Sequence, residues 1–130
     1  MEKQAEKMYK IFLKDVQAIL GDQVTYSNTL NNLCSYLFGS LFQGVFARDT
    51  LPPNVRYAIV NLDRSFESGS HWCAVADGMI YDSFGRDVGF GLKMTDPDAE
   101  QDLLEVNCGQ RCIAFLCVYH LMGAKYAKHI

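Results

Sequence analysis

The fold is decided by residues 71–84, whose sequence is HWCAVADGMIYDSF. Asp77-Gly78 is among the strongest two-residue signals for a β-hairpin, because both positions of the favoured turn need a positive φ. The pair divides the stretch into two short runs with β-forming residues, 71–76 and 79–84. We therefore expect an antiparallel hairpin at the centre of the fold.

The register of this hairpin brings a base close to an acid. With positions 77 and 78 in the turn, residue 73 faces residue 82, and residue 71 faces residue 84. His71 and Asp82 are then diagonal neighbours on one face, within the roughly 7–8 Å that long side chains can bridge. A slip of one residue would place them on opposite faces. The pattern thus predicts an imidazole that is oriented by a carboxylate.

Helical and strand patterns surround the hairpin. Residues 3–20 predict an amphipathic helix with its apolar side at Met8, Phe12, Val16 and Ile19. A second helix is expected from Ser27 or Thr29 toward Gly39, and a buried strand over 56–62. Residues 108–121 are apolar almost all round, which predicts a helix buried in the middle of the domain, with Asn107 as its N-cap. The chain thus combines helices with strands in one predicted domain, 1–130.

Composition and charge narrow the class of function. Of 130 residues, 49% are hydrophobic and 21% are charged, which is typical of a folded globular domain. A net charge of −3 argues against nucleic acid as the main partner, because phosphate binding favours a basic surface. The start of the chain has no apolar segment typical of a signal peptide, and no stretch approaches the roughly 18 apolar residues of a membrane helix. We expect an intracellular protein whose five cysteines are reduced.

Cys108, at the start of the buried helix, is the predicted nucleophile. The positive end of a helix dipole and unpaired backbone N–H groups stabilise a thiolate, and the same groups can hold a developing oxyanion. Gly109 leaves room for the backbone of a substrate, and the side-chain amide of Gln101 is the candidate second oxyanion donor, with Gln110 as the alternative. With His71 as the base, the chemistry is that of a cysteine peptidase.

Five stretches of the sequence, in this order, resemble the adenovirus-type maturation peptidases, which share a clan with the proteases of ubiquitin-like proteins. The stretches are FQGVFARD at 42–49, AIVN at 58–61, GSHW at 69–72, YDSFG at 81–85 and CGQRC at 108–112. Together they span roughly residues 37–120. Each motif alone is weak, whereas the ordered set is fairly specific.

The resemblance implies His71 as base, Asp82 as orienting acid, Cys108 as nucleophile and Gln101 as oxyanion donor. It also implies an α+β fold in which the nucleophile helix packs against a mixed sheet, and a substrate channel walled by Trp72. Capsid and core precursors, often cut beside glycine, are the implied substrates, so the expected location is the host cell and the virion. The chain is shorter than the adenoviral enzymes, as in homologues from virophages and related double-stranded DNA viruses. No cofactor or metal is implied, and the sequence does not say whether a peptide activator is needed.

Other interpretations of the same residues stay open. A protease of ubiquitin or SUMO would use the same site residues and differ only in substrate. A non-enzymatic zinc-binding module would use Cys108 and Cys112 together with His71 and His120. Taken alone, Cys108 would be interpreted as a buried core thiol. Cys73, which lies opposite Asp82 in the expected register, is the rival nucleophile.

Overall fold

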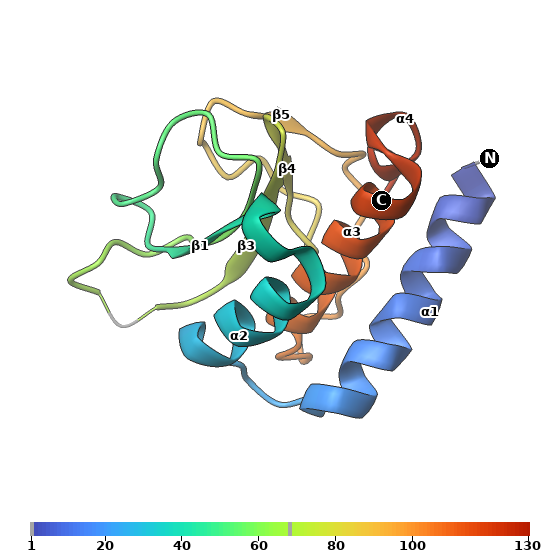
Figure 1. The fold of residues 1–130 in the computed structure, drawn as a ribbon, viewed down its shortest axis with the longest axis horizontal. Helices are drawn as coiled ribbons and strands as arrows, with labels where there is room; N and C mark the ends of the chain where they lie inside the picture. Colours follow the sequence, from blue (N-terminus) through green and yellow to red (C-terminus); the bar gives the residue numbers. More distant parts are fainter. Residues whose placement is uncertain (1, 68) are drawn as a thin grey trace.

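The computed structural model describes residues 2–67 and 69–130, which form an α+β fold with a mixed five-stranded sheet (Figure 1). The elements in chain order are α1 (Glu2–Leu20), α2 (Ser27–Phe38), the 3-10 helix η1 (Gly39–Leu41), β1 (Phe42–Phe46), β2 (Tyr57–Asn61), β3 (Trp72–Ala76), β4 (Met79–Tyr81), β5 (Lys93–Met94), α3 (Cys108–Met122) and α4 (Ala124–Ala127). The strands lie in the order β1-β2-β3-β4-β5. The outer pairs β1/β2 and β4/β5 are parallel, and the inner pairs are antiparallel.

The central hairpin has the expected register. Ala76 pairs with Met79, Val75 with Ile80 and Ala74 with Tyr81. Asp77 and Gly78 form the turn with φ values of 47° and 86°, which are the positive values that the Asp-Gly pair predicts. The predicted strand over 56–62 is β2, and all of its residues are buried.

The sequence did not predict β1 and β5. β1 contains Gln43 and Gly44, and its register with β2 shifts between Phe42 and Val45, so its hydrophobic pattern does not follow a strand period. β5 has only two residues and forms by pairing with β4, which a local pattern does not encode. Both are edge strands, where pairing depends on the strands already in place.

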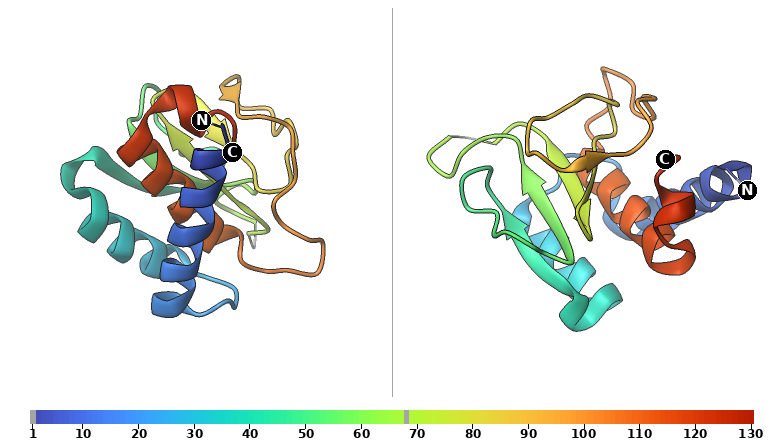
Figure 2. Two further views of the ribbon diagram at one scale, coloured as in Figure 1. Left: turned by 90° about the vertical axis from the view of Figure 1, so that its right-hand side faces the viewer. Right: turned by 90° about the horizontal axis from the view of Figure 1, so that it is seen from above.

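The helices pack in layers on one face of the sheet, with α3 between the sheet and α1 (Figures 1 and 2). Ala74, Ala76 and Tyr81 contribute to the core on this face, where the Tyr81 ring stacks on Phe115 of α3 at 4.8 Å. Val75 and Ile80 belong to a second apolar cluster. The buried central helix predicted over 108–121 is confirmed as α3.

The buried stripe of α1 agrees only in part with the expected one. Val16 is buried as expected, together with Ala5, Tyr9 and Leu13, whereas Met8 and Phe12 are partly buried against the core and Ile19 is 65% exposed. The Tyr9 hydroxyl forms a hydrogen bond of 2.7 Å with the Tyr81 hydroxyl, which turns the Tyr9 side of the helix toward the core. Within the described ranges, no helix combines the length and the apolar character that crossing a membrane requires.

Candidate active site

The base, the acid and the thiol meet at one end of the sheet. His71 directly precedes β3 and Asp82 directly follows β4, so the hairpin brings them to the same end. Cys108 is the first residue of α3, and its Sγ accepts a hydrogen bond from the backbone N–H of Trp72 at 3.5 Å. Three separate segments of the sequence thus converge where the helix begins.

His71 and Asp82 form a short buried pair. His71 Nε2 and Asp82 Oδ1 are 2.6 Å apart, and the two residues are 7% and 2% exposed. Because Nε2 is engaged with the acid, Nδ1 is the ring nitrogen that remains for a thiol. Burial raises the pKa of Asp82, but hydrogen bonds from His71 and Arg86 outweigh it and lower that pKa to about 2. The carboxylate therefore stays charged and can fix the orientation of the imidazole.

Two residues that the sequence analysis did not select support this pair. The Phe84 ring stacks on the His71 imidazole at 4.9 Å, and Arg86 Nε donates to Asp82 Oδ2 at 2.9 Å. The Arg86 guanidinium also lies over the Phe84 ring. The contact of Phe84 with His71 could have been predicted, because the hairpin register places residue 84 opposite residue 71. Arg86 lies in a loop, and no pattern in the sequence predicts its contact.

Of the five thiols, Cys108 alone has a lowered pKa. Burial raises the pKa of Cys108, but hydrogen bonding with His71 and with the N–H groups of Trp72 and Gly109 outweighs it. Burial also lowers the pKa of His71, but its hydrogen bonds to Asp82, Cys108 and Cys73 raise it to about 11. These shifts favour a thiolate beside an imidazolium. Burial raises the pKa of the other thiols, which are Cys34, Cys73, Cys112 and Cys117.

His71 and Cys108 open onto a cleft of about 370 Å³, whose lining also includes the expected residues Trp72 and Gln101. The Trp72 indole N–H donates to the Thr25 carbonyl at 3.2 Å, so the ring is held in place. Trp72 also lines a neighbouring depression of about 420 Å³. It therefore borders both hollows. Cys73 is fully buried and does not line this cleft.

The Gln101 side chain is held by bonds at both ends of its amide. Its Oε1 accepts from the Ser83 hydroxyl at 2.6 Å, and its Nε2 donates to the Glu105 carbonyl at 2.7 Å. A carboxamide nitrogen carries two hydrogens, and the bond to Glu105 uses one of them. Gln110 is placed differently: it is buried, and its Nε2 donates to the carbonyls of Gly21 and Gln23. Gln110 thus ties α3 to the α1–α2 connection.

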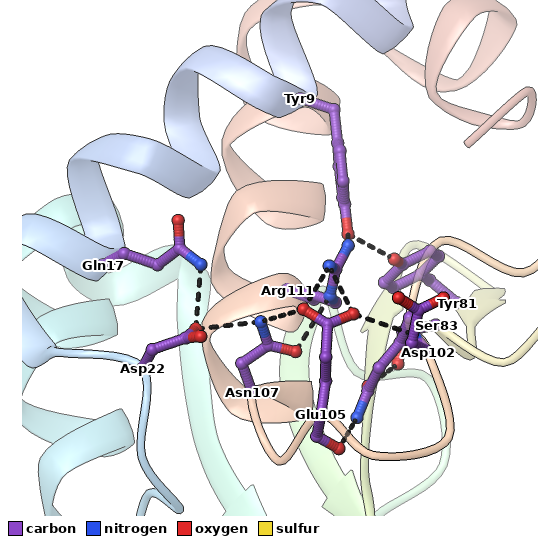
Figure 3. A network of polar contacts seen from close by, with 10 residues as sticks. Tyr9, Gln17, Asp22, Tyr81, Ser83, Asp102, Glu105, Asn107 and Arg111 are labelled. Carbon is purple, nitrogen blue, oxygen red and sulfur yellow. Dashed lines mark hydrogen bonds and ion pairs between the residues drawn. The ribbon is translucent and has the colours of Figure 1, made fainter.

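A second polar network supports the loop that carries Gln101 (Figure 3). Arg111 donates from Nη2 to both carboxylate oxygens of Glu105, at 3.2 and 3.3 Å, and from Nη1 to the Tyr9 hydroxyl at 3.2 Å. Asn107 accepts from Arg111 Nε at 3.0 Å. The residue that precedes the thiol is thereby fixed to α3, and the loop is fixed to α1.

The start of α3 is not capped as predicted. Asn107 makes no side-chain capping bond, because its amide is used by Arg111, Glu105 and Asp22. The first backbone N–H groups of α3 are therefore not occupied by the Asn107 side chain. The physical reason for a glycine at position 109 also differs from the expected one. A Cβ at this position would lie 2.0 Å from Thr25 Oγ1, so the glycine allows the helix to approach the α1–α2 connection closely.

The described residues do not bring together the zinc ligands of the alternative structural module, which are Cys108, Cys112, His71 and His120. Cys112 is fully buried in the core, and His120 pairs with the Tyr57 hydroxyl near the other end of α3. Among residues 2–67 and 69–130, one group of three or more metal-ligating side chains comes together, and it consists of His71, Cys73 and Asp82.

Comparison of the chain with models of protein families, with curated proteins and with solved structures gives no match.

Proposed function

We propose that this chain is a cysteine endopeptidase with Cys108 as nucleophile, His71 as base and Asp82 as the residue that orients His71. One observation carries the proposal: the 2.6 Å His71–Asp82 pair and the Cys108 thiol converge at a cleft that both His71 and Cys108 line. A thiolate beside an imidazolium is a strong nucleophile at neutral pH. The lowered pKa of Cys108 and the raised pKa of His71 support the same pairing.

The proposed reaction follows from the roles of these groups. The Cys108 thiolate attacks the carbonyl carbon of a peptide bond, and the charge that develops on the carbonyl oxygen is stabilised by Gln101 and by backbone N–H groups at the start of α3. His71 donates its proton to the leaving amine, the C–N bond breaks and a thioester remains. His71 then takes a proton from water, whose oxygen attacks the thioester; the C–S bond breaks, the carboxylic acid leaves, and the thiolate–imidazolium pair is regenerated. Asp82 keeps the imidazole oriented in both steps.

The proposed substrates are polypeptides. By the resemblance to adenovirus-type maturation peptidases, they are capsid or core precursors cut beside glycine during virion maturation, inside the host cell and in the virion. The two hollows that Trp72 borders support a binding path for an extended chain. The adenain-like version of the α+β fold is part of this proposal.

The test is to incubate the full chain with denatured proteins and to identify newly formed N-termini by mass spectrometry. New termini that need Cys108, and that Cys108→Ser abolishes, support the proposal. Cys117→Ser is the matched control, because Cys117 is another partly buried thiol of α3 that lies outside the cleft. Cleavage that continues at the same rate in Cys108→Ser would contradict it. Reporters derived from ubiquitin and SUMO distinguish the alternative substrate class.

A further inference from the structure

A second thiol lies beside the candidate base. Cys73 follows His71 by two residues and therefore points to the same face of the hairpin, and Asp82 lies opposite Cys73 in the extended register. One ligand atom from each of the three residues lies within 4.8 Å of the others. All three residues are buried, so the group is not a chance gathering of surface charges.

The three side chains match the requirements of zinc. Zinc binds nitrogen, sulfur and oxygen ligands at about 2.0–2.3 Å, which places tetrahedral ligands roughly 3.3–3.7 Å apart. The three ligand atoms lie within 4.8 Å of one another. His71 Nε2 and Asp82 Oδ1 are closer than the zinc spacing, at 2.6 Å, so zinc takes the place of the proton between them. A set of imidazole, thiolate and carboxylate favours zinc over magnesium or calcium, which prefer oxygen ligands alone.

Neighbouring groups already orient these ligands. Arg86 donates to Asp82 Oδ2 from both Nε and its backbone N–H, which leaves Oδ1 directed toward His71. Phe84 stacks on the imidazole and limits its rotation. Such outer contacts fix the ligands of metal sites. The Arg86 side chain is 51% exposed, so it is the group that separates the buried carboxylate of Asp82 from solvent.

We propose that His71, Cys73 and Asp82 form a zinc site, with water as the fourth ligand, and that bound zinc inhibits the enzyme reversibly by occupying its base and its orienting acid. On binding, the Cys73 thiol and the imidazolium of His71 each release a proton to solvent, so that the sulfur coordinates as a thiolate and the freed ring nitrogen coordinates as a neutral imidazole. Cys108 is not a ligand in this arrangement. The inhibitory half rests on the proposed peptidase function, whereas the metal site itself does not.

The metal site is tested with cobalt(II), which reports thiolate ligation by a charge-transfer absorption, in the Cys108→Ser variant. With Cys108 absent, we expect one equivalent of cobalt to give this absorption and one equivalent of zinc to remove it. Adding Cys73→Ala should weaken binding by more than about 100-fold, since even outer-shell changes cost 10–100-fold. Adding Cys117→Ser should change nothing. No absorption in Cys108→Ser, or an absorption that survives Cys73→Ala, overturns the proposal.

Two further measurements separate the outcomes. If Cys73→Ala fails to fold by circular dichroism, Asp82→Asn in the Cys108→Ser background takes its place, and unchanged cobalt affinity there overturns the site. Zinc should inhibit the wild type until a chelator is added, and inhibit Cys73→Ala far less, relative to its own zinc-free rate. A chain without peptidase activity that still binds cobalt through Cys73 refutes only the proposed function. If the wild type is an active peptidase but its Cys108→Ser variant binds no cobalt, only the proposed metal site is refuted.

Discussion

Two polar clusters contact the first turn of α3. They differ in whether their polar groups are all bonded to one another or lead to a group at an open cleft. In the anchor cluster, formed by Tyr9, Glu105 and Arg111, the guanidinium is bonded to its neighbours through all three nitrogens. In the cleft cluster, formed by His71, Asp82 and Cys108, the contacts run from a buried acid to a thiol that lines an open cleft. The closed cluster ties a loop to the helices, and the open one places a thiol at the cleft.

Burial raises the pKa of a key group in both clusters, but the net shifts are opposite. Burial raises the pKa of Tyr9, so that its hydroxyl stays neutral although Arg111 and Tyr81 counteract the shift. Burial also acts on Cys108, yet hydrogen bonding with His71 and with backbone N–H groups lowers the pKa of that thiol. The balance between burial and hydrogen-bonding partners therefore decides which group is ionised: burial outweighs the partners of Tyr9, and the partners outweigh burial at Cys108.

Removing the base of the cleft cluster should have the largest effect. We expect His71→Ala to reduce kcat/KM at least about 10³-fold, because no group remains to pair with the thiolate or to protonate the leaving amine. The rate is measured on the peptide identified from the new N-termini. His120→Ala, which changes the histidine bonded to Tyr57, is the control and should stay active. Equal losses in both variants would contradict the assignment.

Weakening the acid should have an intermediate effect. Asp82→Asn keeps the shape of the side chain but removes the charge that orients the imidazole, and we expect kcat to fall about 10²-fold. It should also move the start of the Cys108 alkylation profile to higher pH, because less imidazolium is present to stabilise the thiolate. An unchanged pH profile would show that Asp82 does not act through His71.

Loosening the anchor cluster should affect acyl transfer and leave the thiolate intact. We expect Glu105→Ala to lower kcat about 10-fold, because the Glu105 segment holds the Gln101 amide, the proposed donor to the oxyanion. Alkylation of Cys108 forms no oxyanion, so its rate should not change. Asp102→Ala, in the same loop, is the matched control, since Asp102 contacts Glu105 through its backbone N–H. A parallel loss of alkylation would indicate a general structural defect instead.

The smallest expected effect concerns stability near the anchor cluster. Burial raises the pKa of Glu100 from 4.5 to about 9, and its Oε1 has no hydrogen-bond partner among the described residues. The folded state therefore keeps a proton that the unfolded chain loses, and stability should decline as pH rises from about 4.5 to 9. Glu100→Gln should remove this decline and add about 1–2 kcal/mol at pH 8. Urea denaturation at pH 5 and pH 8 measures the free energy of unfolding of the wild type and of the variant. The same change in this free energy between the two pH values in both proteins would contradict the assignment.

Local patterns were sufficient to predict the part of the fold that carries the cleft cluster. The Asp77-Gly78 turn sets the hairpin register, and that register brings His71 to Asp82 without any tertiary information. The apolar pattern of 108–121 likewise predicts a buried helix that begins at Cys108.

The anchor cluster could not be predicted in this way. Arg111 contacts Tyr9, which is 102 residues away in sequence, and no period or turn signal encodes such a contact. Asn107 was a reasonable capping residue by type, but Arg111, Glu105 and Asp22 compete for its amide. Long-range polar partners thus decided the details that the local rules missed.

The most direct test of the central claim is the alkylation rate of each cysteine by iodoacetamide as a function of pH, resolved by mass spectrometry, in the wild type and in His71→Ala. We predict that Cys108 reacts well below pH 8.5, the region where an ordinary thiol ionises, and that His71→Ala abolishes this early reactivity. The other thiols should react slowly, because burial raises their pKa values. An inert Cys108 together with a reactive Cys73, or a Cys108 profile that does not depend on His71, would contradict the account.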